Sequence, residues 1–319
     1  MNFSQGSKME SLAKRFTQLS KIEDETTRKI KLTDLMEGFE RFMESLSKSP
    51  NSLFHTKPVI EIFGWAFPRM ETLIEIEKLV KERKIISAYS IGSGKSFAEF
   101  LLSCVWNGKF VLSDPAYGDS ENWKREGEGT FPISNSLVIP EKFEFGLFDY
   151  SEPSILMMVW PVMSKECHGE GGSDYSHQAL IEFLQNSKEG SLYYYIGEGE
   201  GMCTGTLTMH RIMAHFMKTV HEGEVICFRQ GIHDFVQVLE RKYSKETLCI
   251  LFQESESLIT EEYFLERTSN KKESAKIWKI LEDNNFLCGE ETTVYTKEDI
   301  HKFGKLWFEV KKLGEEFYY

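Results

Sequence analysis

The chain begins with apolar residues at helical spacing. Between residues 35 and 46 they recur with charged residues between them, as in an amphipathic helix: Leu35, Met36, Phe39, Phe42, Met43 and Leu46. Ser, Pro and Asn then interrupt the pattern in residues 47–58. A second helix is predicted to begin after Pro68 and to lead into the first strand. We therefore expect a helical N-terminal segment over residues 1–84.

From residue 85 the pattern changes to short apolar runs separated by amphipathic segments. Strands are predicted at residues 85–91, 109–113, 143–148, 154–160, 191–196, 235–240 and 247–252, and the clearest helices at 96–105, 175–185 and 206–220. Several runs are almost continuously apolar, which is typical of strands covered on both faces. The alternation with helices predicts a parallel sheet. Only six residues separate the last two runs, too few for a helical crossover, so that pair should be antiparallel.

These patterns predict an α/β fold. We expect a Rossmann-like, mostly parallel sheet of seven strands that ends in an antiparallel hairpin, over a core of residues 85–255. Apolar residues return to helical spacing between Ile300 and Phe317, which predicts a helical extension over residues 256–319. Residues 117–140 are rich in Gly, Ser, Asn, Glu and Pro, so a long loop is predicted there, either a lid over a site or a surface insertion.

Composition narrows the class of protein. The 319 residues carry a formal charge of −12, which disfavours nucleic acid as a partner and leaves a small molecule or a protein. None of the six cysteines forms a C-x-x-C pair, so neither a zinc ribbon nor a dithiol redox site is expected. No apolar run reaches the length of a membrane span, and the first residues lack the apolar core of a secretory signal. The expectation is a soluble cytoplasmic protein without a metal; the oligomeric state is not indicated.

A glycine turn carries the strongest functional signal. Gly92, Ser93 and Gly94 lie between the first predicted strand and a helix, and Asp114 ends the next strand 20 positions after Gly94. The carboxyl ends of parallel strands line the ligand crevice, so the turn and this carboxylate should face the same space. Glycines allow close approach of the backbone, and an acid at this spacing accepts hydrogen bonds from ribose hydroxyls. The pattern predicts a site for a nucleoside-containing cofactor; a purely structural turn is the alternative.

The letters GSGKS at residues 92–96 also resemble the end of a phosphate-binding P-loop. That loop requires a glycine five positions before its last glycine, and Tyr89 occupies the position instead. A P-loop nucleotide binder is therefore the least favoured hypothesis.

Acidic residues near the later strands are candidates for acid–base chemistry. Glu198 and Glu200 follow the strand predicted at residues 191–196. Either of them is a candidate to orient an acceptor or to serve as a general base. The alternative is that this segment is only an acidic turn. Asp234 directly follows a histidine in the sequence. This pair is a candidate base, and a turn cap is the alternative. Three histidines in the helix predicted at 206–220 and just after it are five and six positions apart, which does not suit a metal site.

Four features together resemble the class I S-adenosylmethionine-dependent methyltransferases. They are the SIGSG turn, the strand ending in Asp114, the ILMMVWP run and the terminal strand pair. The chain is more closely similar to one branch of that superfamily, which has a W-A-x-P element, a Trp-Pro after the fourth strand, and a segment from Ile-Gly-Glu to Thr-Gly. These correspond to residues 65–68, 160–161 and 196–205. The likeness covers roughly residues 60–255.

The resemblance implies S-adenosyl-L-methionine as the cofactor. Gly92, Ser93 and Gly94 would hold its methionine and ribose part, and Asp114 its ribose hydroxyls. Asp149, at the end of the strand predicted at 143–148, would face the adenine amino group. Trp160 and Pro161 would lie where the methyl group meets the acceptor.

The resemblance also implies a methyltransferase whose acceptor is not identified. An acid is common in the branch at the position of Asp234. Two positions depart from the family: Ser90 stands where an acid contacts the cofactor's ammonium group, and Ser96 replaces the third glycine. These departures favour the alternative of a catalytically inactive, methyltransferase-like binding module, whereas Asp114 argues against it.

Overall fold

The computed structural model describes residues 3–48, 59–114, 131–140, 143–161, 175–199, 204–205, 207–226, 234–251 and 279. Except for residue 279, the helical extension expected over residues 256–319 lies outside them. Packing divides the chain into two units. The first comprises Met1–Pro161, Lys188–Glu198 and Thr219–Glu240, and the second comprises Val162–Ser187, Gly199–Lys218 and Arg241–Tyr319. Each unit is described by itself.

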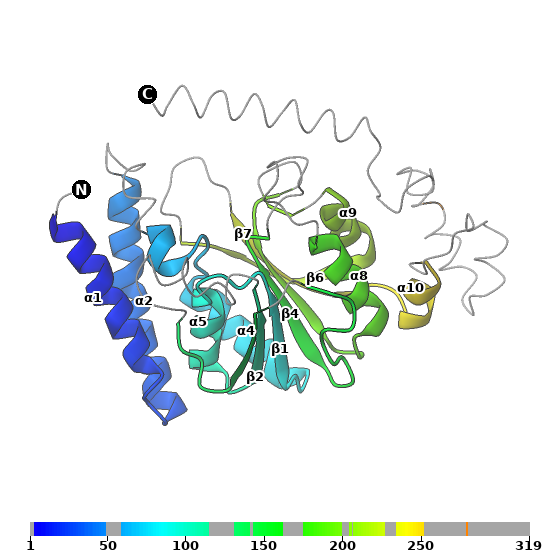
Figure 1. The fold of residues 1–319 in the computed structure, drawn as a ribbon, viewed down its shortest axis with the longest axis horizontal. Helices are drawn as coiled ribbons and strands as arrows, with labels where there is room; N and C mark the ends of the chain where they lie inside the picture. Colours follow the sequence, from blue (N-terminus) through cyan, green and yellow to red (C-terminus); the bar gives the residue numbers. More distant parts are fainter. Residues whose placement is uncertain are drawn as a thin grey trace, which may run out of the picture. The chain divides into compact units, whose positions relative to one another are not determined.

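One sheet of seven strands organises the fold (Figure 1). Its strands are β1 (Ser87–Ile91), β2 (Lys109–Ser113), β3 (Ser136–Ile139), β4 (Ser154–Val159), β5 (Leu192–Gly197), β6 (Met217–Glu224) and β7 (Phe235–Arg241), in the order β3-β2-β1-β4-β5-β7-β6. The pairs from β3 to β5 are parallel, and β5 pairs with β7 in the antiparallel sense. The predicted fold class, a mostly parallel Rossmann-like sheet with an antiparallel end, is confirmed.

Strand register aligns side chains across the middle of the sheet. Ser90 of β1 pairs with Met157 of β4, and Met157 pairs with Tyr194 of β5. Residues paired in this way point to the same face of a sheet. All three are fully buried, so this row belongs to the core and brings two polar groups, one hydroxyl and one phenol, into it.

Two predicted strands are absent. Residues 143–148 form turns, whereas β3 lies earlier, inside the region predicted as a long loop. Residues 247–252 were predicted as a strand, but Lys245–Leu251 form helix α10. A short apolar run does not distinguish a strand from a buried helical turn, because both bury every side chain over that length.

The antiparallel end of the sheet is also built differently from the prediction. The helix predicted at residues 206–220 ends at Phe216, and residues from Met217 onward form β6. Strand β7 therefore lies between β5, with which it pairs in the antiparallel sense, and β6. Residues 247–252, which were predicted to be its antiparallel partner, are not its neighbour in the sheet. Most side chains of β6 are exposed or half-buried, since it is an edge strand, and its sequence has no apolar alternation to mark it.

The first unit includes helices α1 (Phe3–Leu19), α2 (Glu25–Ser47), α4 (Met70–Glu82) and α5 (Phe97–Val105). Asp24 begins α2 by accepting a hydrogen bond from the Thr27 N–H at 2.7 Å, which satisfies one of the free donors of the first turn. Helices α2 and α4 contain the helical stripes predicted from the sequence. Helix α5 packs against both of them.

A cluster of phenylalanines joins the N-terminal helices to the core. The ring of Phe97, at the start of α5, lies 5.1 Å from Phe16 of α1 and 5.6 Å from Phe39 of α2, both edge-to-face. Phe63 lies 5.0 Å from Phe97 and from Phe39. Edge-to-face pairs of this kind contribute about 0.5–1.5 kcal/mol each beyond the burial of their area. Helices α1 and α2 are thus part of the core of this unit.

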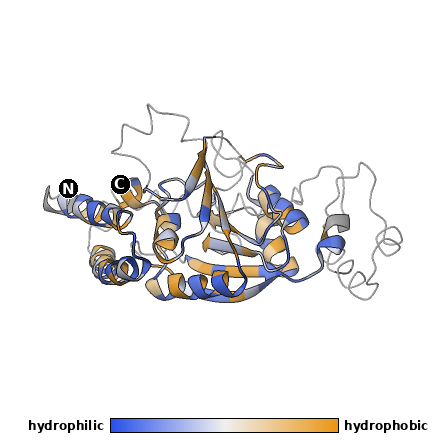
Figure 2. Cartoon of the chain, turned by 90° about the horizontal axis from the view of Figure 1, so that it is seen from below, coloured by the Kyte–Doolittle hydropathy of each residue, from blue (hydrophilic) through white to orange (hydrophobic). Residues whose placement is uncertain are grey.

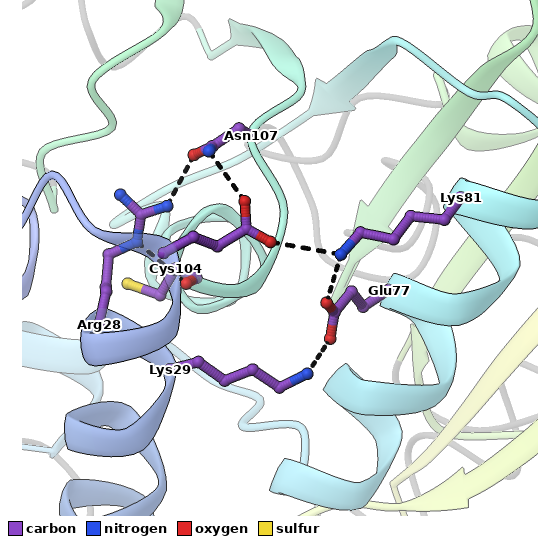
Figure 3. Close-up of polar contacts among 7 residues, drawn as sticks. Arg28, Lys29, Glu77, Lys81, Cys104 and Asn107 are labelled. Carbon is purple, nitrogen blue, oxygen red and sulfur yellow. Dashed lines mark hydrogen bonds and ion pairs between the residues drawn. The ribbon is translucent and has the colours of Figure 1, made fainter.

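A polar network around the buried side chains of Arg28 and Glu77 reinforces this junction (Figure 3). Arg28 of α2 donates to the Cys104 carbonyl near the end of α5 at 3.0 Å and to Asn107 at 2.6 Å. A cation suits a helix C-terminus, where carbonyl groups lack intrahelical partners. Beside it, Glu77 of α4 accepts from Lys29 and from Lys81. Burial alone would raise the pKa of Glu77, but the two lysines outweigh it and hold that pKa below its usual value.

The second unit contains helices α8 (Ser176–Asn186), α9 (Leu207–Phe216) and α10. Helix α8 packs against α9 and against α10. Arg241 and Lys245 donate to the carbonyls of Leu184 and Asn186 at the end of α8, at 3.4 and 2.9 Å. In Figure 2 the helices of the chain show hydrophobic and hydrophilic residues on different sides. In the described ranges, no helix is both long and apolar enough to span a membrane.

Candidate functional site

The glycine turn after β1 is fastened to the end of β2. The Gly92 N–H donates to the Ser113 carbonyl at 2.8 Å, and the Gly94 N–H donates to Oδ2 of Asp114, also at 2.8 Å. The turn closes on itself through the Ser96 N–H and the Ser93 carbonyl at 2.7 Å. Since β1 and β2 are parallel neighbours, the turn and the carboxylate meet at the carboxyl edge of the sheet, as the sequence predicted.

The backbone of this turn adopts conformations that favour glycine. Gly92 and Gly94 have φ of 64° and 48°, and Ser96 has φ of 56° although it carries a side chain. A Cβ added at Gly94 would meet nothing within 4 Å, so the space beside the turn is open. Ser96 therefore keeps the left-handed geometry of the glycine that it replaces in the resembling family. The turn combines open space, a close backbone approach and the Asp114 carboxylate.

Glu99 is a site residue that the sequence analysis missed. It lies in the first turn of α5, is 1% exposed, and accepts a hydrogen bond from the Ser90 hydroxyl at 2.5 Å. Burial raises the pKa of Glu99 to about 7, the Ser90 hydrogen bond opposes this rise, and the negative charge of Asp114 adds to it. The carboxyl group of Glu99 in α5 thus lies at the end of β1, beside Ser90, whose own side chain has no carboxyl group. Glu99 is the one charged residue within Phe97–Val105, an otherwise apolar and buried helix. This isolated charge in an apolar run could have identified Glu99 from the sequence.

Tyr194 lies close to this carboxyl group. It is fully buried, its hydroxyl has no hydrogen-bond partner in the part of the chain that the structure describes, and it shares a sheet row with Ser90. Burial raises the pKa of Tyr194 well above its usual value, and the charge of Glu99 adds to this effect. Tyr194 is therefore a neutral phenol, and its environment disfavours a second negative charge beside Glu99.

A second group of candidate residues meets where β4 and β5 end and β7 begins. The indole N–H of Trp160 donates to Oδ1 of Asp234 at 2.9 Å, and the Trp160 backbone N–H donates to the Ile196 carbonyl at 2.7 Å. Gly197 pairs with Phe235 in the antiparallel β5–β7 ladder, so the next step of that register places Glu198 opposite Asp234. The structure thus brings together Trp160, Asp234 and Glu198, three residues selected from separate parts of the sequence.

The two carboxyl groups of this second site affect each other. Burial raises the pKa of Asp234 to about 7, the hydrogen bond from Trp160 opposes the rise, and the charge of Glu198 adds to it. Glu198 is 3% exposed, and its backbone carbonyl accepts from the Tyr195 hydroxyl at 2.6 Å. Like charges opposite each other on neighbouring strands repel, and protonation of one of them relieves the repulsion. Asp234 is therefore an acid that gains and loses a proton near neutral pH.

Trp160 is held in an unusual conformation. Its φ of 53° lies in the left-handed region, which costs a bulky residue of order 1–3 kcal/mol and is found disproportionately at functional sites. Its ring stacks on Trp65, with centroids 4.7 Å apart and planes at 11°. Trp65 reaches the sheet because Phe67 and Pro68 pair with Ile226 and Val225 after β6. The hydrogen bonds and the stacking together fix the orientation of the Trp160 ring.

The other predicted site residues are placed as follows. Pro161 is buried directly after Trp160. Asp149 is exposed in the loop before β4 and accepts from the Ser151 N–H at 2.9 Å, which lowers its pKa. The strand predicted at residues 143–148 is absent, and the adenine contact of Asp149 stays a prediction. Glu200 lies outside the described residues.

The described residues hold no group of three or more His, Cys, Asp or Glu side chains able to bind a metal ion. Of the histidines predicted to share a helix, His210 donates a hydrogen bond from Nε2 to the Thr204 carbonyl at 2.7 Å. That contact lies within the second unit and gives His210 a structural partner.

No protein-family model matches the chain, and no curated protein matches it. Among solved structures it is similar to a mutant of MtNAS in complex with S-adenosylmethionine, with 11% identity over 76% of this chain and 99% of that one, at a TM-score of 0.34. It is also similar to the 23S rRNA methyltransferase ErmE, with 12% identity over 76% and 99% at 0.34. The mitomycin 7-O-methyltransferase MmcR has 10% identity over 54% of each chain at 0.32, so the match spans about half of that protein. Similarities at this level do not assign a reaction or an acceptor to this chain.

Proposed function

We propose that the chain is an S-adenosylmethionine-dependent methyltransferase. One observation carries the proposal: the hydrogen bond from the Gly94 N–H to the Asp114 carboxylate at 2.8 Å, at the carboxyl edge of the parallel strands. It joins a backbone that a nucleoside can approach closely to an acid that accepts from ribose hydroxyls. The order of the seven strands and the resemblance of the sequence point to the same class.

The residues around the turn fit this cofactor. Gly94 leaves open space where a side chain would stand, and Asp114 is 9% exposed, so its carboxylate borders the surface of the site. Gly92, Ser93 and Gly94 would hold the methionine and ribose part, and Asp114 the ribose hydroxyls. When bound, S-adenosylmethionine supplies an electrophilic methyl group on a positively charged sulfur.

The Ser90–Glu99 pair supplies negative charge where the family has an acid on the strand. Glu99 gains or loses a proton near pH 7, and a bound cation would favour its ionised form by direct attraction. We assign to this pair the role of holding the ammonium group of the cofactor. On this proposal, Glu99 of α5 supplies the carboxylate that Ser90 does not have.

The alternatives draw little support from the geometry. Ser96, the second departure, adopts the left-handed backbone of the missing glycine, so it does not by itself indicate an inactive binding module. Tyr89, which would have to be the first glycine of a P-loop, is a strand residue whose hydroxyl donates to the Asp149 carbonyl. A side chain buried on a strand does not form part of a phosphate-wrapping loop.

The test compares cofactor binding by the unmodified protein and by Asp114→Asn. Asparagine keeps an oxygen acceptor for the Gly94 N–H but removes the charge and the second acceptor. Isothermal titration calorimetry with S-adenosylhomocysteine should show binding by the unmodified protein and at least about a tenfold loss in the variant, which corresponds to about 1.4 kcal/mol. Asp34→Asn, a change at an exposed acid of α2, is the matched control and should bind as the unmodified protein does.

Unfolding temperatures distinguish a lost contact from a lost fold. Asp114→Asn should unfold within a few degrees of the unmodified protein. The proposal fails if folded, unmodified protein does not bind S-adenosylhomocysteine at millimolar concentration. It is also refuted if Asp114→Asn and Asp34→Asn bind equally well.

A further inference from the structure

We infer that the methyl acceptor is a neutral, planar nitrogen compound, an aromatic amine or nitrogen heterocycle, that stacks on Trp65 and gives up a proton to Asp234. This inference rests on the proposed function and adds the chemical class of the acceptor. It is carried by the residues that meet at the ends of β4 and β5: Trp65, Trp160, Asp234 and Glu198.

The two stacked tryptophans make a flat apolar surface, on which Trp65 is the more exposed residue. Trp160 lies beneath, held by its hydrogen bonds to Asp234 and to the Ile196 carbonyl, and Trp65 stacks on it with nearly parallel planes. Trp65 is 40% exposed, so part of its ring remains accessible to a further planar group. An exposed indole that is already oriented by a second indole binds a flat ring without an additional ordering cost.

The charge beside this surface selects against anionic acceptors. The β5–β7 register, continued by one step, puts Glu198 opposite Asp234, and the charge of Glu198 adds to the rise that burial causes in the pKa of Asp234. A phenolate, thiolate or carboxylate acceptor would bring a third negative charge to the same place. A neutral nitrogen instead becomes positively charged as it is methylated, and both the carboxylates and the indole faces stabilise that charge.

The proton released in this reaction has a defined destination. A bond forms between the acceptor nitrogen and the methyl carbon, while the carbon–sulfur bond breaks and its electron pair stays on the sulfur of S-adenosylhomocysteine. The resulting cation then loses an N–H proton to the Asp234 carboxylate: an amine loses it from the methylated nitrogen, and a heterocycle such as benzimidazole loses it from the other ring nitrogen. The hydrogen bond from the Trp160 indole N–H uses Oδ1 of Asp234 and helps to fix the position of the carboxylate.

The experiment uses planar bicyclic compounds that differ in the reacting group. Benzimidazole provides a neutral nitrogen, 2-naphthol an oxygen and 2-naphthoate a fixed negative charge. Binding to the full chain in the presence of S-adenosylhomocysteine is followed by quenching of tryptophan fluorescence and confirmed by calorimetry. We expect benzimidazole to bind at least tenfold more tightly than 2-naphthoate, and labelled S-adenosylmethionine to yield N-methylbenzimidazole.

Two variants connect this preference to the named residues. Trp65→Leu should weaken benzimidazole binding at least tenfold, while Trp106→Leu, at a tryptophan buried against Phe110 elsewhere in the unit, should not. Asp234→Asn should bind benzimidazole but abolish the preference over 2-naphthoate and slow methyl transfer. Calorimetry with S-adenosylhomocysteine should give the same affinity for Trp65→Leu, Asp234→Asn and the unmodified protein.

The outcomes separate this inference from the proposed function. If S-adenosylhomocysteine does not bind, the proposed function fails. If it binds but 2-naphthol or 2-naphthoate binds as well as benzimidazole does, the acceptor class is wrong and the proposed function stands. Equal benzimidazole binding by Trp65→Leu and the unmodified protein would likewise overturn the inference.

Discussion

Replacement of Glu99 by glutamine should make the protein more stable at alkaline pH. Glutamine has the shape of the protonated acid and keeps an oxygen that accepts the Ser90 hydroxyl hydrogen bond, so the core contact survives. What the variant loses is the ability to ionise in the buried interior. Because Glu99 is 1% exposed and lies near the charge of Asp114, its ionisation is costly in the folded chain.

The size of the effect follows from the two pKa values. Glu99 has a pKa of about 7 in the folded chain against 4.5 for an ordinary glutamate. Between these values the folded chain holds a proton that the unfolded chain has lost, so the free energy of unfolding decreases as pH rises through this window. A pKa difference of this size corresponds to about 3 kcal/mol above pH 7. Summed over the titration, the advantage of Glu99→Gln should grow by roughly 2 to 3 kcal/mol from pH 5 to pH 8.

Urea unfolding at pH 5 and pH 8 measures this difference directly. Glu144→Gln, at an exposed glutamate of the loop before β4, is the matched control and should give the same small change at both pH values. The reasoning is refuted if the stability difference between Glu99→Gln and the unmodified protein does not change between pH 5 and pH 8. A carboxyl ¹³C titration of Glu99 near 4.5 in the folded protein would contradict it independently.

Three further changes test other parts of the structure. Arg28→Met should lower the free energy of unfolding by about 3 kcal/mol, since it leaves the buried Cys104 carbonyl and the partly buried acceptors of Ile22 and Asn107 without their donor. Arg41→Met, at an exposed arginine of α2, should lower it by less than about 0.5 kcal/mol, and urea unfolding measures both. Ser96→Gly should be tolerated and Ser96→Val should cost about 1–2 kcal/mol, because the backbone there is left-handed; equal stabilities would contradict this. Methyl transfer should decline as pH falls through about 7, where Asp234 becomes protonated beside Glu198 and Trp160, and Asp234→Asn should lack this decline.

The strands that the sequence identified are the ones buried on both faces. Every residue of β5 is buried, and four of the five in β1 and in β2, so their sequences are mostly apolar and their ends could be predicted closely. The strands that were missed, β3 and β6, lie at the two edges of the sheet and are mostly exposed. An edge strand needs only one neighbour and no apolar face, so composition does not distinguish it from a loop.

The two candidate sites differ in how far the sequence could predict them. The glycine turn and Asp114 form one local unit of strand, turn and strand, and their spacing along the chain was enough. Glu99 was overlooked because its importance depends on which face of α5 is buried. The meeting of Trp160, Glu198 and Asp234 depends on the register between β5 and β7, which the sequence analysis could not supply because it assigned a different partner to β7.

Glu99 and Asp234 both have a pKa of about 7, yet the structure gives them separate roles. Glu99 is enclosed in the core near Ser90 and Asp114, so its ionisation lowers folding stability, and the role proposed for it is toward the cofactor and not toward the acceptor. Asp234 is half-buried beside an exposed indole, so a proton can pass between it and a bound acceptor. Replacement of Glu99 should therefore change the pH dependence of unfolding and leave the acceptor preference intact. Replacement of Asp234 should abolish the acceptor preference, whatever its effect on stability. If Glu99→Gln instead altered the choice between benzimidazole and 2-naphthoate, the two carboxyl groups would belong to one site, and the division of roles argued from their burial would be wrong.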